Sequence, residues 1–586
     1  MEDHEKGRDA FPDEESYRLH ALRHSAAHVM AEALAKVFPG AKFAFGPPVQ
    51  DGFYYDVDVS RPITEGDFSA IEAEMKAISK RNSEFKKAIV TQAEAEVIFA
   101  DQPFKLQHIR RLTGPLSTYD QGGFTDLCGG PHVPRTGNVK HVKLMKVSGA
   151  YWLGDPANPQ LQRVYGTVWP TREALDQYLY RLEEAKKRDH RKVGTQMGLF
   201  MFHEYAPGAP FWLPKGETLW HILSEAMRSA LLRDGYVAVR TPMVFDKALF
   251  ETSGHWAHYR DNMFHFTKQE EGEVEGRTFG LKPMNCPCHM LIFGSTKRSY
   301  RELPLRIHDQ GVLHRDEVHG ALGGLTRVRQ FSQDDGHLFC MESQLPDEID
   351  KLLALVERVY QPLGLSFKAK LSTRPAERMG DDAMWDAAEA ALEGALRKND
   401  VEYTINAGDG AFYGPKIDID VYDALGRAWQ CATIQVDYQN PLRFDLTYVG
   451  ADNAVHHPVV IHRAVFGSFE RFIGILIEHY AGHFPMWLAP EQVRVMTVSE
   501  KSEAWGRSVH QALLAAGIRA ELDVGSEKIG AKIREAHAAR PVYMVVIGEK
   551  EQDTATVSAK GQEGDLGSMP LDAFITRCVE ESKVPF

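Results

Sequence analysis

The segment that most constrains the fold is R-D-E-V-H-G-A-L-G-G-L-T-R-V-R-Q-F-S-Q-D-D-G-H-L-F, residues 315–339. We expect two strands, at about 311–317 and 330–340, joined by a long glycine-rich loop. Side chains alternate between the two faces of a strand. One face of this pair then carries Arg315 and Glu317 together with Phe331, Gln333, Asp335, His337 and Phe339. So many specific polar groups beside two phenylalanines predict a partly enclosed binding site rather than a solvated surface.

The composition favours a soluble intracellular protein of several domains. A length of 586 residues is enough for about three or four domains. No apolar run approaches the roughly 18–20 residues that span a bilayer, and the polar, acidic N-terminus is unlike a signal peptide. Six cysteines in so long a chain do not indicate a disulfide framework. We therefore expect a cytoplasmic protein with no membrane partner. The net charge of −13 does not favour nucleic acid binding, but local Lys and Arg clusters decide that property.

Changes in pattern along the chain predict five segments. We expect a disordered tail at 1–18 and a mixed α/β region at 19–170, with a helix beginning near residue 19. A charged connecting helix should follow at 171–196. A large mixed region at 197–488 precedes a small domain of alternating strands and helices at 489–586.

Cys286, His337 and His462 are candidate metal ligands in the large middle region. Two His and one Cys suit Zn²⁺, and three protein ligands leave one position open for a substrate. The three residues are far apart in sequence, so spacing alone leaves three independent buried side chains as the alternative. Cys288 and His289 are competing ligands nearby.

The N-terminal region contains two short motifs rich in His and Cys, H-S-A-A-H (24–28) and C-G-G-P-H (128–132). His24 and His28 share one helix face, and Cys128 and His132 are also four residues apart. This spacing suits a second zinc site, and Asp126 is a plausible further polar contact. A single His pair on a helix would more often be core packing, but the second motif favours a functional site.

Three ordered motifs make the chain similar to class II aminoacyl-tRNA synthetases. L-L-R-D-G-Y-V-A-V-R-T-P-M-V (231–244) resembles motif 1, the segment around Arg315 and Glu317 resembles motif 2, and F-G-S-F-E-R-F (466–472) resembles motif 3. With K-P-M-N-C-P, Q-D-D-G-H and I-H-R-A as well, residues 20–586 resemble the threonyl-tRNA synthetases. The resemblance implies a multidomain α/β and α+β fold. Its parts would be an antiparallel-sheet catalytic core, an N-terminal α+β editing domain and a C-terminal α/β anticodon-binding domain.

The resemblance also implies an activity, which is ATP-dependent activation of L-threonine and its transfer to tRNA(Thr) in a homodimer. Arg315 and Arg471 would be catalytic, because fixed cations stabilise the charge that develops on the phosphate. The ATP-binding set, with Mg²⁺, would be Arg315, Glu317, Arg327, Phe331, Gln430, Thr433, Ser468 and Arg471. The threonine-binding set would be Gln333, Asp335, Tyr413 and Gln435. Gln430 and Thr433 have opposite strand parity, so we expect a bulge or twist between them.

The same resemblance implies that both clusters of His and Cys help to discriminate threonine from similar amino acids. Cys286, His337 and His462 would hold one Zn²⁺ per subunit, which valine, lacking the hydroxyl group of threonine, cannot fully ligate. Serine lacks only a methyl group, so a second, hydrolytic site is expected. Editing of Ser-tRNA(Thr) would fall to His24, His28, Cys128 and His132, with an activated water and no required metal.

Departures from the family leave two alternatives open. The chain begins without the small ubiquitin-like domain of many bacterial members, and V-S-A-K-G-Q (557–562) replaces a strand that usually carries arginines. Gly323 and Gln330 alter the motif 2 loop, and Asn440 stands where an apolar residue is usual. The alternatives are a divergent duplicate copy that tolerates a synthetase inhibitor, and a non-charging tRNA-binding or editing protein.

A basic helix near the C-terminus is a candidate contact for the tRNA backbone. Residues 526–536 carry Lys528, Lys532 and Arg534, and Arg540 follows. These cations could track phosphates. An ordinary solvated helix is the alternative, because Glu527 and Glu535 dilute the charge.

Overall fold

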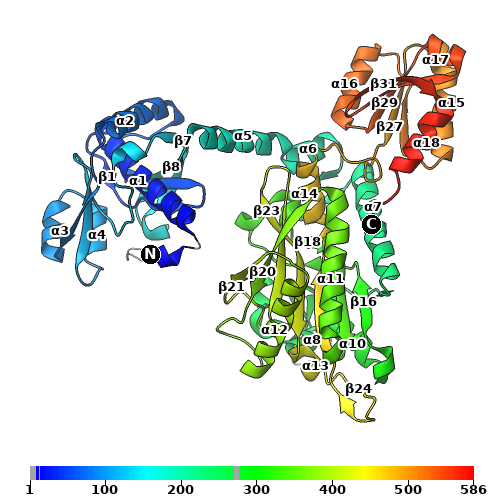
Figure 1. Ribbon diagram of the computed structural model, residues 1–586, viewed down its shortest axis with the longest axis horizontal. Coiled ribbons are helices and arrows are strands. Elements are labelled where there is room, and N and C mark those ends of the chain that lie inside the picture. Colours follow the sequence, from blue (N-terminus) through cyan, green and yellow to red (C-terminus); the bar gives the residue numbers. More distant parts are fainter. Residues whose placement is uncertain (1–7, 12, 270–275) are drawn as a thin grey trace. The chain divides into compact units, whose positions relative to one another are not determined.

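The computed structural model describes residues 8–11, 13–269 and 276–586. It divides into two compact units, Met1–Glu183 and Glu184–Phe586, each with its own arrangement of sheets and helices (Figure 1). Across the described ranges, no helix combines the length and the apolar character needed to cross a membrane.

The first unit is built on a sheet with the strand order β1 (Lys42–Phe43), β3 (Gly52–Asp58), β8 (Gln160–Trp169) and β7 (His141–Tyr151), and β2 (Pro48–Val49) also pairs with β3. Helices α1 (Glu14–Val37) and α2 (Phe68–Arg81) pack together and form one apolar core with this sheet. The side chain of Asp13 accepts a hydrogen bond from the Ser16 N–H at 2.7 Å and caps α1. The helix therefore begins before the expected residue 19, and the predicted tail to residue 18 is too long. Residues 1–7 and 12 of that tail lie outside the described residues.

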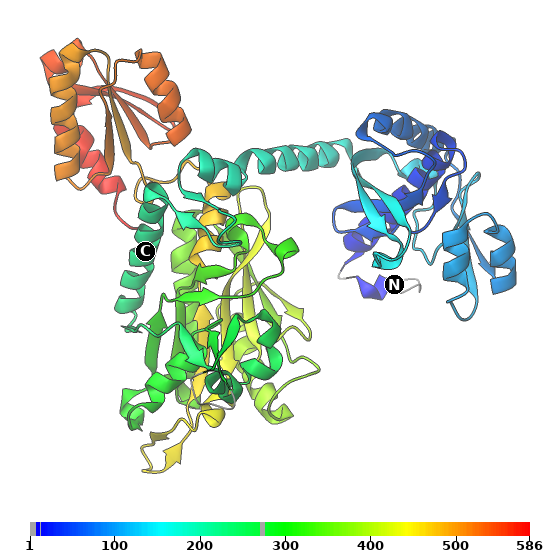
Figure 2. The ribbon, with the colours of Figure 1, turned by 180° about the vertical axis from the view of Figure 1, so that it is seen from behind.

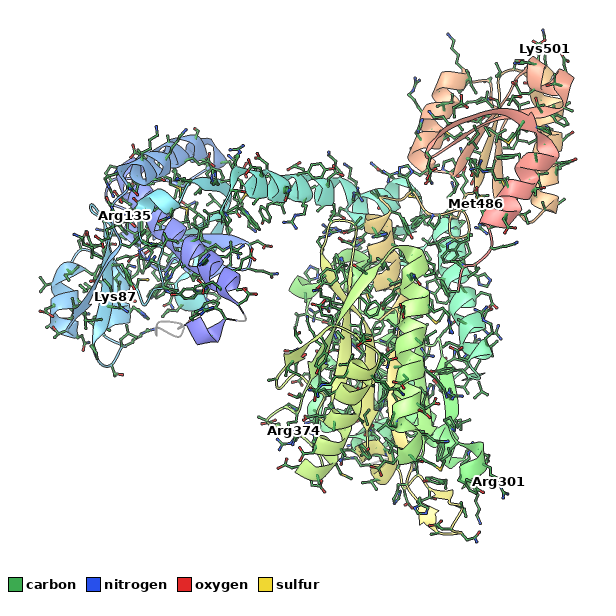
Figure 3. All side chains as sticks on the ribbon, in the orientation of Figure 1. Lys87, Arg135, Arg301, Arg374, Met486 and Lys501 are labelled. Atoms are coloured by element: carbon green, nitrogen blue, oxygen red, sulfur yellow. The ribbon has the colours of Figure 1, made fainter. Side chains whose placement is uncertain are left out.

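A smaller sheet completes the first unit. Its strands are β4 (Lys86–Val90), β5 (Leu116–Asp120) and β6 (Thr125–Leu127), and α3 (Gln92–Ile98) and α4 (Pro103–Ile109) connect β4 to β5. Lys87 marks strand β4 in Figure 3. β6 ends just before Cys128, so this sheet positions the second sequence motif of the N-terminal cluster.

The connecting segment consists of two helices, which corrects the prediction of a single helix over 171–196. α5 (Arg172–Arg188) ends before Asp189, and α6 (His190–Gln196) begins after it. Asp189 has a non-helical backbone, and its carboxylate accepts from the Arg191 N–H at 2.8 Å. An aspartate that caps the next helix ends the preceding one at the same residue.

The second unit is dominated by an eight-stranded sheet. Its order is β11 (Val237–Ala238), β16 (Leu305–Asp309), β19 (Asp335–Cys340), β26 (Val459–Ala464), β23 (Ala428–Asp437), β22 (Lys416–Tyr422), β20 (Ser366–Ser372) and β21 (Tyr403–Asn406). Only the two edge strands, β11 and β21, run parallel to their neighbours among these described strands. The expected antiparallel core is present.

The two faces of this sheet differ in chemistry because its strands alternate. Leu338, Ile461 and Ile434 project to one side and join a core that includes α7 (Pro214–Arg233), α11 (Leu345–Tyr360), α12 (Asp382–Lys398) and α14 (Phe469–His479). Figure 2 shows the same sheet from behind. The neighbours of these residues in sequence, His337 and His462, point to the opposite face.

Shorter elements surround the sheet of the second unit. Three small sheets are formed by β12 (Val244–Asp246), β14 (Arg277–Leu281) and β13 (His265–Lys268), by β15 (Arg298–Ser299), β24 (Tyr448–Val449) and β25 (Val455–His456), and by β9 (Phe200–Met201) and β10 (Phe211–Trp212). The short helices are α8 (Lys247–Ser253), α9 (His255–His258), α10 (Cys286–Gly294) and α13 (Gln439–Arg443).

The hairpin expected around the motif 2 loop is present with different strand bounds. β17 (Val312–His314) pairs with β18 (Gln330–Ser332), and the central sheet then takes over at β19. The predicted strand 330–340 is therefore interrupted at Gln333 and Asp334. The side chain of Asp334 points into the protein and accounts for this break, as described below.

The C-terminal domain is the expected α/β arrangement. Its sheet order is β28 (Ala520–Asp523), β27 (Val493–Thr497), β29 (Tyr543–Ile547), β30 (Thr556–Gly561) and β31 (Gly564–Pro570), and β27 is parallel to both neighbours. Its helices are α15 (Glu503–Ala515), α16 (Ile529–Ala539), α17 (Glu549–Thr554) and α18 (Leu571–Glu581).

Lys532 on α16 does not belong to a surface patch, contrary to the sequence-based suggestion. It is 2% exposed, and its ammonium group donates to the Thr497 carbonyl at 3.0 Å and pairs with Asp523 at 3.4 Å. A buried lysine needs such partners. Lys528 and Arg534 are exposed and remain candidates for a contact with phosphates.

His308 on β16 predicts how the stability of the second unit depends on pH. It is 2% exposed, and neither ring nitrogen has a hydrogen-bond partner among the described residues. Burial lowers the pKa of His308 to about 4, and the charges of Arg463 and Arg228 act in the same direction. The unfolded chain, with a pKa of about 6.5, takes up a proton first. Stability is therefore complete above about pH 6.5 and falls as the pH drops towards 4.

We expect His308→Leu to weaken this dependence by about 2 kcal/mol at pH 5. Thermal unfolding of wild type and variant should be compared at pH 7.5 and pH 5, with His221→Leu, at an exposed position on α7, as the control. Equal losses of stability on acidification in all three proteins would contradict the assignment.

Candidate functional site

One face of the central sheet carries a row of polar side chains from three adjacent strands. His337 on β19 lies opposite His462 on β26, which lies opposite Gln435 on β23. Cys286, the first residue of α10, completes a group with the two His. The sulfur and the ligand nitrogens of Cys286, His337 and His462 all lie within 4.8 Å of one another, and all three residues are buried. The fold thus brings together three candidate ligands that are spread over more than a hundred residues of the chain.

Neighbouring groups orient this cluster. His462 Nε2 contacts the Asp437 carboxylate at 2.8 Å, and Asp437 is fully buried. His337 Nδ1 lies 2.7 Å from Nδ1 of His289, which therefore contacts a ligand of the group instead of belonging to it. Cys288 also stands outside the group. Burial raises the pKa of the Cys286 thiol, so a thiolate here requires a nearby cation. The donor set and the burial both fit a metal site of the zinc type.

The four residues predicted to bind an amino acid lie on the same face. Asp335 accepts a hydrogen bond from Asn285 at 3.1 Å, and burial raises its pKa to about 6. The Tyr413 ring centroid lies 5.3 Å from that of His462. Gln435 and Gln333 donate to main-chain carbonyls, at 3.3 Å to Gly414 and at 2.7 Å to Gly467. The group of candidate metal ligands is therefore lined by acceptors and donors suited to a small polar ligand.

A β-bulge lies between Gln430 and Thr433, as the opposite strand parity of these two residues predicts. On β22, Ile419 pairs with Ala432 but Asp420 pairs with Gln430, so Cys431 is the extra residue. Gln430 Nε2 and Thr433 Oγ1 both donate to one oxygen of Asp418, at 2.7 and 3.2 Å. The expected bulge is confirmed, and it places the two side chains on one face.

Asp418 was missed by the sequence argument although its pattern is readable. The run K-I-D-I-D (416–420) alternates, so Lys416, Asp418 and Asp420 share a face. Lys416 pairs with Asp418 at 2.7 Å. This strand therefore supplies a cation and an acceptor beside the bulge.

Arg315 and Phe331 come together at the end of the β17–β18 hairpin. The Arg315 guanidinium lies 5.0 Å from the Phe331 ring centroid. Glu317 forms an ion pair with Arg327 at 2.9 Å. The Arg327 side chain is mostly exposed, so this pair can separate when a ligand competes for it at little cost.

Arg471 and Ser468 lie at the start of α14. Ser468 caps the helix, and its Oγ accepts from the Arg471 N–H at 3.1 Å. Nε of Arg471 is buried and has no hydrogen-bond partner within the part of the chain that the structure describes. A buried donor of this kind is costly unless a ligand satisfies it.

A buried ion pair fixes β19 to the turn before α14. Asp334 is fully buried. It pairs with Arg463 at 3.1 Å and accepts from the main-chain N–H groups of Val465 and Phe466, at 2.8 and 2.9 Å. In the run Q-D-D, Asp334 therefore serves the structure, while Gln333 and Asp335 face the polar row.

The first unit contains a second group of His and Cys. The ligand atoms of His24, His28, Cys128 and His132 lie within 4.8 Å of one another. Cys128 Sγ is 3.1 Å from His24 Nε2 and 3.2 Å from His132 Nε2. Burial lowers the pKa of His24 to about 4 and raises the pKa of the Cys128 thiol. The neutral groups can exchange hydrogen bonds with one another, but Nδ1 of His24 is buried and has no hydrogen-bond partner among the described residues.

Two residues at this second group were not found from the sequence. Tyr55 donates to Asp126 at 2.6 Å, and the ammonium group of Lys105 contacts both Asp126 and Tyr55. Lys105 is 4% exposed. His28 Nε2 lies 3.6 Å from the same Asp126. No spacing rule links these positions, because they come from β3, α4 and β6.

A third group, Asp189, His190 and Glu478, has ligand atoms at similar separations. Both ring nitrogens of His190 are already engaged, one by Glu478 at 2.6 Å and the other by the Leu325 N–H at 3.0 Å. With no nitrogen left to bind a cation, this group is a hydrogen-bonded junction.

Three protein-family models match the chain. They are the tRNA synthetase class II core domain (G, H, P, S and T) over residues 266–480, the anticodon binding domain over 492–581, and the threonyl and alanyl tRNA synthetase second additional domain over 116–165. The polar row falls largely within the first match, and Cys128 and His132 fall within the third.

Curated relatives match nearly the whole chain. A threonine–tRNA ligase of Anaeromyxobacter dehalogenans is 50% identical over 97% of this chain and 89% of its own length. One from Myxococcus xanthus is 48% identical over the same shares. Among solved structures, a putative threonyl-tRNA synthetase from Aeropyrum pernix is 27% identical with a TM-score of 0.58, covering 68% of this chain and 97% of that one.

The cluster of Cys286, His337 and His462 predicts one tight metal site. After chelation, the full chain should take up one equivalent of Zn²⁺, because a buried thiolate and two imidazoles form a high-affinity set. Chelator competition should show that Cys286→Ala weakens binding at least a hundredfold, whereas Cys288→Ala binds as wild type does. A second tight equivalent, lost in His24→Ala, would instead place a metal at the group in the first unit.

Proposed function

Because the chain belongs to the threonyl-tRNA synthetase family, we propose that it activates L-threonine with ATP on the polar face of its central sheet and transfers it to tRNA(Thr). The observation that carries this proposal is the convergence of Cys286, His337 and His462 with four amino-acid-binding candidates inside the class II core. The complete set of cationic and metal-binding side chains opposes a non-charging protein. No feature of the described residues favours an inhibitor-tolerant duplicate.

Activation requires attack of the threonine carboxylate on the α-phosphorus of ATP, with pyrophosphate leaving. Arg315 is proposed to hold the α-phosphate, and Arg327 and Arg471 the outer phosphates. Positioned cations stabilise the charge of the transition state more than that of the ground state. The buried, unsatisfied Nε of Arg471 supports its assignment.

The rest of the nucleotide is proposed to lie between the hairpin and the bulge. Phe331 would stack on the adenine ring. The Arg315 guanidinium group already lies beside the Phe331 ring, so a base stacked on Phe331 would lie close to Arg315. Glu317 would accept from the adenine amino group after its ion pair with Arg327 separates. Gln430, Thr433 and Ser468 are proposed as further contacts, and Mg²⁺ would accompany the phosphates.

Threonine is proposed to bind at the metal cluster. Cys286, His337 and His462 would hold Zn²⁺, which when bound supplies an open coordination position that distinguishes an amino acid with a hydroxyl group from valine. Asp335 would receive the ammonium group, and Gln333, Tyr413 and Gln435 would orient the rest of the amino acid. Asp437 fixes the ring of His462 through a hydrogen bond.

The group in the first unit is proposed to hydrolyse Ser-tRNA(Thr). One methyl group gives only about 1–3 kcal/mol of discrimination, which is too little for accurate protein synthesis. His24, His28, Cys128 and His132 would bind the ester and position a water molecule. Because burial keeps the imidazole of His24 neutral near pH 7, it can accept a proton from that water.

Membership of the family also leads us to propose a homodimer and a cytoplasmic location. Several exposed apolar side chains lie in motif 1, namely Leu232, Val237, Met243 and Val244. They suit the subunit contact of a homodimer, since an edge strand and an apolar patch both favour association. All six cysteines are free thiols, which is consistent with a reducing cytoplasm.

Threonine-dependent exchange of pyrophosphate with ATP tests the proposed activity. Wild type should catalyse it, and Arg315→Ala should lower kcat/KM by about 10²–10³, the effect of removing one preorganised charge. Arg301→Ala, an exposed position on η6 (Tyr300–Glu302), is the matched control and should not change it. Absence of threonine-dependent exchange in the wild type would refute the assignment.

Hydrolysis of preformed Ser-tRNA(Thr) tests the second site separately. His24→Ala and Cys128→Ala should each lose at least tenfold in hydrolysis and keep normal threonine exchange, because each unit has its own core. His141→Ala, on β7 of the same unit, is the control. If both cluster variants hydrolyse at the wild-type rate, the editing assignment is wrong.

A further inference from the structure

His190 lies where three segments of the second unit meet. It is the first residue of α6, which is separated from α5 by Asp189, and it is 4% exposed. Its Nδ1 contacts the Glu478 carboxylate on α14 at 2.6 Å, and Glu478 also accepts from the His190 main-chain N–H at 3.1 Å. On its other side, Nε2 accepts from the Leu325 N–H at 3.0 Å. The motif 2 loop is thus tied to the connecting segment through one imidazole ring.

The hydrogen bonds fix the proton on this ring. The Leu325 N–H can only donate, so Nε2 must be an acceptor. A neutral imidazole then carries its proton on Nδ1, where the carboxylate of Glu478 accepts it. Glu478 in turn forms an ion pair with Arg427 at 2.7 Å. The ring is therefore held in one tautomer and one orientation.

The loop is shaped to meet His190. Gly324 has a φ of +62°, and a Cβ atom there would lie 2.3 Å from His190 Nε2, so only glycine allows this approach. The Leu325 side chain is fully buried in the core of the second unit. Gly474 on α14 leaves the space in which Leu325 packs, since a Cβ there would meet Leu325 Cβ at 3.3 Å.

The anchored turn is the one that presents Arg327. Residues Gly324–Thr326 form η8, and the Gly323 N–H donates to the Arg327 carbonyl at 3.1 Å. Thr326 Oγ1 closes the same turn by donating to the Gly323 carbonyl at 2.7 Å. Arg327 leaves the turn with its side chain exposed. Leu325 and Arg327 thus belong to one closed turn, so the anchored backbone at Leu325 sets the point from which the Arg327 side chain leaves the loop.

We propose that His190 is a positioning residue for ATP: it holds the motif 2 turn so that Arg327 meets the outer phosphates. The proposal rests on the phosphate role given to Arg327 above. The same contacts would couple the end of α5 to ATP binding. Arg188, two residues before His190, donates to the His479 carbonyl at the end of α14 at 3.1 Å.

Two substitutions of His190 separate the contributions of its two hydrogen bonds, one through Nδ1 and one through Nε2. Asn places an amide nitrogen near the position of Nδ1, so His190→Asn keeps the donor to Glu478 and loses the acceptor for Leu325. Gln places an oxygen near the position of Nε2, so His190→Gln keeps the acceptor and loses the donor. In threonine-dependent pyrophosphate exchange, His190→Asn should raise the KM for ATP roughly three- to tenfold, the loss expected for one hydrogen bond. His190→Gln should raise it by a clearly smaller factor, and the KM for threonine should not change in either variant.

A double-substitution cycle decides whether the effect passes through Arg327. In an Arg327→Ala background, His190→Asn should add no further increase in the KM for ATP. Equal KM values for the Asn and Gln variants, or an undiminished effect in the Arg327→Ala background, would overturn the proposal. Activity lost only in proportion to the folded fraction, followed by circular dichroism, would also overturn it. Absence of exchange in the wild type would instead refute the proposed function itself.

Discussion

The buried carboxylate of Asp334 is the constraint on which both halves of the proposed activation site depend. It lies between β18 and β19 and binds Arg463 and the main chain of the turn that leads to α14. Removing one partner of such a buried pair leaves an uncompensated charge and costs about 3–5 kcal/mol. The same interaction therefore links Gln333 and Asp335, which are proposed to contact the amino acid, to the start of α14 with Ser468 and Arg471, which are proposed to contact ATP.

Strand alternation was sufficient to predict most of the polar face. The parity of Gln333, Asp335 and His337 follows from local geometry, and so does the need for a bulge before Thr433. The bulge at Cys431 is present. Residue types suggested Cys286, His337 and His462 as metal ligands, family resemblance favoured that grouping, and the fold brings their ligand atoms within 4.8 Å of one another. The roles of these residues towards substrates stay predictions.

What the sequence could not supply comes from contacts between remote segments. The strand break at Asp334 depends on Arg463, far along the chain, and the burial of Lys532 depends on a carbonyl of β27. Tyr55 and Lys105 reach Asp126 from separate elements, so no periodicity reveals them. The division between α5 and α6 was missed for a different reason: Asp189 fits the pattern of a charged helix, and only its capping geometry shows that it ends one.

The apolar clusters also carry an evolutionary consequence. One core is made from residues between Leu22 and Val168, and another from residues between Val193 and Phe586, with no member shared between them. The proposed charging and editing sites therefore rest on separate apolar cores. Selection on the proposed editing site, for instance where serine is abundant or scarce, can then change one core without altering the core that supports the proposed charging site.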